Sequence, residues 1–326
     1  MILLNKEDIR KVYSMKDAIE GNKECYALDA QGKFVVPLRP VIQAEKGNFI
    51  FMPSYSSDMN AAACKIVNIF PGNGAIGLPG SIGQVMLFDG DTGEAKALLD
   101  GTYVTALRTA AASGAAFELL GRDDAKIGAM IGTGSQAMCQ LEAMLTARKL
   151  DEVRVAARNF EKTKAFVEKA NAELADYGTR IVACEDTNEA VKDADLVILV
   201  TVSHEPVCSA DFFKPGCVIS AVGAYQHEMQ ELDPAVFDKC GKIYFDNMEA
   251  VLSESGDILK PLDAGTLSKE QFTGDIGDLI LGNIPGRDSD EEIIVFENVG
   301  FGALDLVAAA KIAEKAAAAG VGIEWK

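Results

Sequence analysis

Three cationic side chains stand in apolar stretches of this sequence: Arg39 in VVPLRPVI, Lys65 in AAACKIVNIF and Arg108 in YVTALRTAAAS. Burying a charge without a partner is costly, so such residues are usually ion-paired or bind an anionic ligand. Arginine binds a carboxylate through two parallel hydrogen bonds, and a lysine with a pKa lowered by desolvation can donate a proton. Together the three residues indicate a carboxylate-binding site. Structural ion pairing is the alternative for each of them.

A glycine-rich turn follows the apolar run at 126–131, and there Gly132, Gly134 and Ala137 fit the pattern G-x-G-x-x-A. In such a turn the first glycine permits a sharp bend and the second lets a pyrophosphate approach the backbone. The small third residue lets the next helix pack closely on the strand, and the N–H groups of that helix face the phosphates. The pattern predicts a dinucleotide site. The alternative is an ordinary strand–helix turn.

The end of the following strand is where a dinucleotide site selects its cofactor. An acidic residue there would bind the ribose hydroxyls of NAD and repel the 2′-phosphate of NADP. The sequence instead has Arg158 and Asn159, which favour NADP(H), while the nearby Glu161 keeps NAD(H) possible.

Other catalytic arrangements are absent from the sequence pattern. We find no Ser-His-Asp arrangement, no metal-ligand cluster and no P-loop, and so expect no metal. His204 and His227 are candidate acids, although an isolated histidine more often has no catalytic role. Seven cysteines are scattered singly without a C-x-x-C pair, which favours reduced thiols over disulfides or zinc.

The elements that must position these residues fall into two groups. Short β-branched and aromatic runs bounded by Gly and Pro predict strands in the first part of the chain, and 89–93 is a plausible hairpin connection. A helix is expected at 102–121. The expected strands lie at 33–43, 47–56, 62–73 and 83–101.

From residue 126 on, short apolar runs alternate with helical segments, which predicts a parallel, doubly wound sheet. The fold class is therefore α/β, with a Rossmann domain at 119–301 and a strand-rich α+β domain at 1–118. The last helix, within 302–326, is expected to join the first domain. The expected strands are 126–131, 152–157, 180–185, 195–202, 217–224 and 292–299.

Composition restricts the partners. With 48% hydrophobic and 25% charged residues the sequence is typical of a globular protein, and its net charge of −18 argues against nucleic acid or an anionic membrane. The charged N-terminus is unlike a secretory signal, and no apolar run approaches the ~20 residues that span a bilayer. We expect a cytoplasmic protein.

The blocks quoted above, with FMPSYSSDMNAAACKIVNIFPGN, LFDGDTGEAKALLDGTYVTALRTAAAS, IGTGSQA, DADLVILVTVSHEPV, AVGAYQHEMQELD and FENVGFGALDLVAAA, resemble the ornithine cyclodeaminase and mu-crystallin family along nearly the whole chain. The family includes cyclodeaminases, an archaeal type of alanine dehydrogenase, ketimine and pyrroline-carboxylate reductases, and opine dehydrogenases. The resemblance implies a homodimer whose first domain binds substrate and builds the interface, and a Rossmann domain that holds a nicotinamide cofactor.

The resemblance also implies roles for individual residues. Arg39 and Lys65 would bind the substrate carboxylate and act in catalysis, Lys65 in proton transfer. Met52 would line the substrate site, and Arg108 would contact the substrate or the cofactor phosphates. Besides Arg158 and Asn159, which the strand end indicates, the cofactor-binding residues implied by the resemblance would be Gly132, Thr133, Gly134, Ser135, Gln136, Thr201, Ser203, Val222, Gly223, Val299 and Gly300.

One position departs from the cyclodeaminase pattern. Cyclodeaminases and the related alanine dehydrogenases have an Asp shortly after the AVGA block, where this chain has Tyr225. That Asp is thought to handle the distal amine of the substrate, so its absence argues against cyclodeamination. Glu228 is the acid that follows Tyr225, three residues later.

These observations favour an oxidoreductase that reduces the C=N bond of a small 2-imino acid, such as pyrroline-2-carboxylate, which would give proline. The alternatives are ornithine cyclodeaminase, a lyase that uses NAD, and an amino-acid or opine dehydrogenase. A ligand-binding protein without catalysis is a further alternative.

Overall fold

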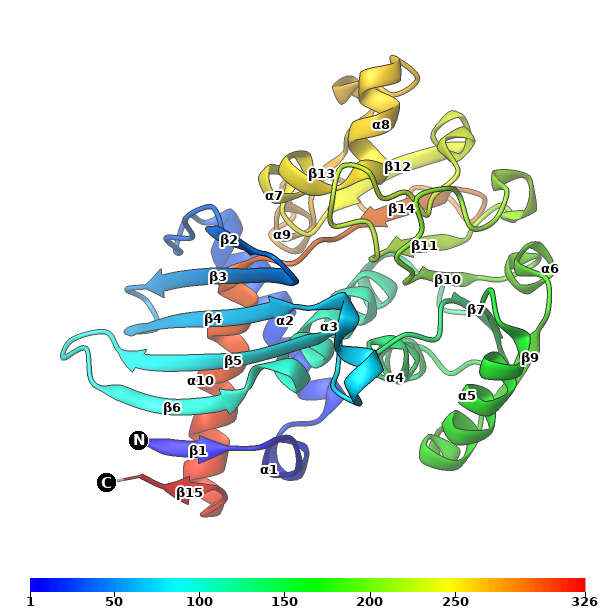
Figure 1. Ribbon diagram of the computed structural model, residues 1–326. Helices are drawn as coiled ribbons and strands as arrows, with labels where there is room; N and C mark the ends of the chain where they lie inside the picture. Colours follow the sequence, from blue (N-terminus) through cyan, green and yellow to red (C-terminus); the bar gives the residue numbers. More distant parts are fainter. Residues whose placement is uncertain (326) are drawn as a thin grey trace. The chain divides into compact units, whose positions relative to one another are not determined.

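A computed structural model describes residues 1–325 of the chain (Figure 1). The backbone forms two compact units. The first comprises Met1–Arg108 and the segment from Phe301 on, and the second comprises Thr109–Gly300. The division after Arg108 and the expected boundary after residue 118 both lie within helix α3 (Gly101–Leu120). Because α3 is continuous, no break in composition marks either position.

The first unit is built on a seven-stranded sheet with the order β15-β1-β6-β5-β4-β3-β2. Strands β6 to β2 are antiparallel neighbours, whereas β1 is parallel to β6. The expected hairpin at 89–93 is confirmed, since it joins β5 to β6. The strands are β1 (Ile2–Leu4), β2 (Val41–Ala44), β3 (Gly47–Ser56), β4 (Ala61–Ile69), β5 (Ser81–Asp89), β6 (Ala95–Asp100) and β15 (Ile323–Glu324).

Helix α10 (Gly302–Ala319) packs against one face of this sheet, where it contacts β3 to β6, and also contacts α1 (Lys6–Val12) and α2 (Met15–Ala30) (Figure 1). Local sequence starts the two N-terminal helices. The Asn5 and Ser14 side chains each accept a backbone hydrogen bond in a capping box. Buried apolar residues such as Leu304 and Ile312 then fix α10 on the sheet.

The expected strand at 33–43 is wrong for residues 33–40. In residues 33–40 the structure has only an isolated bridge between Val35 and Tyr55, and β2 begins at Val41. Pro37 and Pro40 account for the difference, because proline has no N–H to donate to a sheet. The expected strand at 62–73 also ends early, because a short 3-10 helix begins at Pro71.

The second unit contains an eight-stranded parallel sheet with the order β13-β12-β14-β11-β10-β7-β8-β9. The doubly wound Rossmann fold is thus confirmed, with β7 at the point where the strand order reverses. The strands are β7 (Ile127–Ile131), β8 (Glu152–Ala156), β9 (Arg180–Cys184), β10 (Leu196–Leu199), β11 (Val218–Ala221), β12 (Cys240–Phe245), β13 (Gly274–Asp275) and β14 (Ile293–Glu297).

Helices flank this sheet, and its core includes Ile131, Leu199, Ile219, Phe245 and Val295, all of them buried. None of the helices among residues 1–325 has the length and hydrophobicity that a bilayer crossing requires. The helices of this unit are α4 (Ala137–Ala147), α5 (Phe160–Glu173), α6 (Thr187–Val191), α7 (Met248–Glu254), α8 (Gly256–Ala264) and α9 (Ile276–Ile280), with 3-10 turns at Ala175–Tyr177, Ala210–Phe212, Pro234–Asp238 and Lys269–Gln271.

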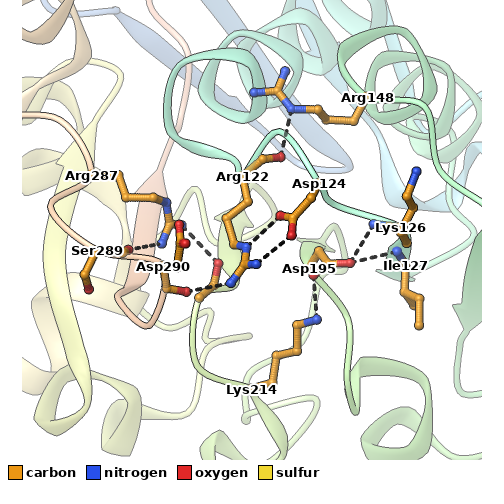
Figure 2. A network of polar contacts seen from close by, with 11 residues as sticks. Arg122, Asp124, Lys126, Ile127, Arg148, Asp195, Lys214, Arg287, Ser289 and Asp290 are labelled. Atoms are coloured by element: carbon orange, nitrogen blue, oxygen red, sulfur yellow. Dashed lines mark hydrogen bonds and ion pairs between the residues drawn. The ribbon is translucent and has the colours of Figure 1, made fainter.

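A polar network in the second unit surrounds Arg122, just after α3, and includes Arg148 and Asp290 (Figure 2). Contacts of two of its arginines also hold the C-terminal end of α3. The last carbonyls of a helix lack partners within it, and here two arginines supply them. Arg287 Nε donates to the Leu120 carbonyl at 2.8 Å, and Arg148 Nη2 donates to the carbonyls of Glu118 and Gly121 at 3.1 and 3.0 Å. The two arginines thereby join the end of α3 to the segments that follow α4 and precede β14.

Candidate active site

Lys65 lies in the middle of β4, on the face of the first unit's sheet that α10 covers. Its side chain is completely buried. Met52, also buried, is its register partner on β3, so the structure brings these two predicted substrate-binding residues together. An ammonium group at such a place requires a partner.

Asp305 in the first turn of α10 is that partner. Its Oδ2 lies 2.7 Å from Lys65 Nζ, and its Oδ1 lies 3.3 Å from Arg108 Nε. Asp305 is fully buried and Arg108 nearly so. The contact with Lys65 is an ion pair without well-directed hydrogen-bond geometry, which leaves ammonium N–H groups for a ligand.

The environment favours the neutral form of the Lys65 amine. Burial lowers the pKa of Lys65 from 10.5 to about 7, aided by the positive charges of Arg108 and Arg39, while Asp305 opposes the change. The charge of Arg39 thus acts on Lys65. Lys65 and Arg108 share Asp305, and Met52 lies beside Lys65. A lysine poised near neutrality can donate or accept a proton.

Neighbouring residues fix this cluster. A Cβ on Gly302 would lie 2.9 Å from the Pro53 carbonyl, so only glycine lets α10 start this close to β3. Ser54 Oγ donates to the Gly302 carbonyl at 3.0 Å, and the buried Asn22 Nδ2 donates to the Arg108 carbonyl at 2.8 Å.

The predicted glycine turn of the second unit connects β7 to α4 at the switch point of the sheet. Gly132 has a φ of +122°, and a Cβ there would lie 2.4 Å from the Val200 carbonyl. Gly132 therefore serves close packing of the turn against the end of β10.

The start of α4 is suited to a phosphate group. A Cβ on Gly134 would meet nothing within 4 Å. The backbone N–H groups of Thr133, Gly134, Ser135 and Gln136 donate to no backbone carbonyl among residues 1–325. Gln136 Oε1 is also buried without a partner in that range. Open space and unused polar groups at a helix N-terminus fit a dinucleotide.

Arg158 and Asn159 follow β8, as the sequence predicts. Both are exposed, and Asn159 caps α5 by accepting the Lys162 N–H at 3.0 Å. The Asn159 oxygen is thus used by the helix, which leaves the Arg158 guanidinium as the group that could meet a 2′-phosphate.

The remaining predicted cofactor residues lie at the C-terminal ends of the central strands. Thr201 and Ser203 follow β10, and the Thr201 side chain accepts the Ser203 N–H at 3.2 Å. Val222 and Gly223 follow β11. The Glu231 carboxylate accepts the backbone N–H groups of both Thr201 and Gly223.

Val299 and Gly300 follow β14. The buried Asp246 accepts their N–H groups at 3.4 and 2.7 Å. These predicted cofactor residues therefore all follow the C-terminal ends of neighbouring strands, at one edge of the sheet, as expected for a switch-point site.

The two histidines are both exposed. His227 Nε2 lies 2.9 Å from Asp263 Oδ2, and His204 Nδ1 lies 3.1 Å from the Glu228 carbonyl. The two histidines thus make contacts at the surface of the second unit. All seven cysteines are free.

The family model described as the ornithine cyclodeaminase/mu-crystallin family matches residues 1–320. The chain belongs to this family. The match confirms the resemblance that the sequence blocks indicate.

One curated protein and two solved structures illustrate the similarity of this chain to other proteins. A Delta(1)-pyrroline-2-carboxylate reductase of Bacillus cereus is 33% identical, over 99% of this chain and 98% of that protein. The solved Delta(1)-pyrroline-2-carboxylate reductase of Thermococcus litoralis, in complex with NADH and L-proline, is 35% identical with a TM-score of 0.94 and covers 100% of both chains. An archaeal alanine dehydrogenase dimer with bound NAD is 32% identical with a TM-score of 0.91, over 100% of this chain and 99% of that one.

Tyr225 marks the departure from the cyclodeaminase pattern within the family. It is half-buried just after β11, and its N–H donates to the Gly223 carbonyl at 3.2 Å. Glu228 is exposed, with its backbone carbonyl accepting Lys260 Nζ at 2.6 Å. A phenol thus stands where the resemblance places a carboxylate.

Sequence reasoning missed Asp305 and Glu231. A single acid in the apolar run GALDLVAAA could have indicated Asp305, because a charge on the buried stripe of a helix needs a partner. Glu231 lies among other polar residues in QHEMQELD, and nothing in that stretch predicts its complete burial.

Proposed function

We propose that this protein reduces the C=N bond of small cyclic 2-imino acids, such as pyrroline-2-carboxylate, with a reduced nicotinamide cofactor. The observation that carries the proposal is the buried Lys65, held by Asp305 beside Arg108, with its pKa near 7. A site of this kind offers positive charge to a carboxylate and a transferable proton to an imine nitrogen.

Each residue has a defined task. Arg39 and Lys65 bind the substrate carboxylate, and Met52 forms an apolar wall beside Lys65. Arg108, held by Asp305, adds positive charge near the carboxylate. The Lys65 ammonium keeps the imine nitrogen protonated, which makes the imine carbon a better electrophile. When bound, a reduced nicotinamide supplies the hydride that this carbon accepts. The product is the amino acid, which is proline for the five-membered ring.

The glycine turn and Arg158 are proposed to hold the cofactor. The N–H groups at 133–136 would bind the pyrophosphate, and Gln136 would contribute its unused oxygen. Arg158 and Asn159 stand directly after β8 where an acid would bind the ribose hydroxyls of NAD, which supports a preference for NADPH, although Glu161 lies three residues after Arg158. The two solved relatives hold NADH and NAD, so both cofactors must be compared directly.

An exposed apolar face supports a homodimer. Ile42, Phe49 and Ile66 on β2 to β4 lie on the sheet face opposite Lys65, with 57%, 37% and 37% of their surfaces exposed. A second copy would cover such a patch. Light scattering should give twice the chain mass, and Ile66→Asp should shift the protein toward monomer.

The decisive assay follows the absorbance of NADPH or NADH with pyrroline-2-carboxylate. Consumption of cofactor and formation of proline are expected. No consumption with any 2-imino acid, or with a 2-oxo acid plus an amine, would overturn the proposal. Ammonia released from ornithine with catalytic NAD would identify a cyclodeaminase instead, and steady NAD reduction with alanine would identify an amino-acid dehydrogenase.

A further inference from the structure

Three carboxyl groups meet in the interior of the second unit. Glu231, Asp257 and Glu297 have no solvent exposure, and they come from the loop after β11, the start of α8 and the end of β14. None of them has an ion-pair partner among residues 1–325. Lys260 acts on Asp257 only at a distance, since its ammonium donates to the exposed Glu228 and His204 carbonyls. Buried acids without a cation need protons or N–H donors instead.

Glu231 is satisfied by backbone donors from two different segments. One oxygen accepts the Thr201 N–H and the other accepts the Gly223 N–H at 2.5 Å. A Cβ on Gly223 would lie 2.0 Å from the Thr201 carbonyl and 2.2 Å from Glu231 Oε2. The carboxyl group therefore joins the segments that follow β10 and β11.

Asp257 holds Glu231 in this position. Asp257 Oδ1 accepts the backbone N–H groups of Glu231 and Leu232 at 2.7 and 2.9 Å. Glu297 Oε1 accepts the Ser255 hydroxyl at 2.7 Å. The second oxygens of Asp257 and Glu297 are buried without a hydrogen-bond partner in the described chain.

Burial and mutual repulsion favour the protonated form of these carboxyl groups. Burial raises the pKa of Glu231, Asp257 and Glu297, and their mutual repulsion raises those of Glu231 and Glu297 further, with Asp246 adding negative charge at Glu297. Cys208 also faces Glu231. Because both Glu231 oxygens accept N–H groups, the unpartnered Oε2 of Glu297 is the place for a proton.

We propose that Glu231 is a positioning residue for the nicotinamide half of the cofactor site: its carboxylate fixes the Thr201 and Gly223 backbones, and Asp257 and Glu297 hold it there. The inference rests on the proposed function, because the resemblance assigns Thr201 and Gly223 to the cofactor.

Glu231→Gln tests the bridge. The amide keeps the shape of the side chain but presents an NH₂ group to one of the two N–H donors, so one segment must move. We expect the Kd for NADH and NADPH, measured by fluorescence titration, to rise about tenfold or more. The matched control is Glu291→Gln, an exposed glutamate before β14, which should bind as the wild type does.

The pH dependence separates positioning from general stability. Raising the pH removes the proton of Glu297, so carboxylate repulsion should displace Glu231 and weaken wild-type cofactor binding in alkaline solution. Glu297→Gln cannot ionise, and its Kd should change less over the same pH range. This variant still provides a test if Glu231→Gln fails to fold.

The outcomes are distinct. If Glu231→Gln binds both cofactors within about twofold of wild type, or Glu297→Gln retains the full alkaline weakening, the positioning role is wrong. If the wild type binds neither cofactor, the proposed function itself fails.

Discussion

Lys65 Nζ and Asp305 Oδ2 lie 2.7 Å apart in a place that water does not reach. One residue comes from the middle of β4 and the other from the first turn of the last long helix. Without Asp305, the ammonium of Lys65 would face only the positive charges of Arg108 and Arg39. The C-terminal helix thus supplies the carboxylate that favours the ammonium form of a lysine 240 residues earlier in the chain, against the effect of burial.

The pH profile of the reduction should report Lys65. Its pKa in the free protein is about 7, and reduction requires the ammonium form, so kcat/KM should fall as the pH rises through about 7. Asp305 favours the ammonium, hence Asp305→Asn should lower that pKa and move the fall to lower pH. Rates at several pH values for both proteins test this prediction. Coincident profiles would show that Asp305 does not tune Lys65.

Replacing Lys65 by Met should separate binding from turnover. Methionine fills the buried site without a transferable proton, so kcat should fall ~10²–10⁴-fold. Cofactor affinity should stay near wild type, because the glycine turn lies in the other unit. Lys96→Met, an exposed site on β6, is the control that should retain activity. Full activity of Lys65→Met would remove Lys65 from the mechanism.

The sequence predicted those features that depend on local pattern. The glycine turn was placed correctly because the spacing of its glycines is typical of a strand–helix unit. The apolar strands on either side of it were placed correctly because strands buried on both faces form continuous apolar runs. Strand β12 was not anticipated. It contains Lys242, which is buried only because Asp288 and Glu292, far along the chain, lie 2.6 and 2.8 Å from its ammonium.

The site was also predicted only as far as local sequence pattern allows. Arg39, Lys65 and Arg108 were recognisable as charges in apolar surroundings. The roles of Asp305 and Glu231 depend on contacts across 240 and 30 residues of chain, which no local pattern records.

Two glycines of the turn should respond differently to substitution. Gly132→Ala places a methyl group against the Val200 carbonyl in a left-handed conformation, and should lower the free energy of unfolding by about 1–3 kcal/mol. Gly134→Val extends into open space, so the melting temperature should change little while cofactor affinity falls. Thermal melts with NADH titrations measure both effects. A Gly134→Val protein with unchanged affinity would place the pyrophosphate elsewhere.

The charge of Arg158 should decide the choice between the two cofactors. Arg158→Glu replaces a group that binds a 2′-phosphate with one that repels it and can accept the ribose hydroxyls, so the ratio of NADPH to NADH affinity should fall ~10–100-fold. The ratio, rather than either Kd alone, is the measurement, because a general disturbance of the turn weakens both cofactors equally. Lys169→Glu makes the same charge change at an exposed site on α5 and should leave the ratio unchanged. An equal fall in both variants would indicate a long-range charge effect. An unchanged ratio in Arg158→Glu would show that other residues select the cofactor.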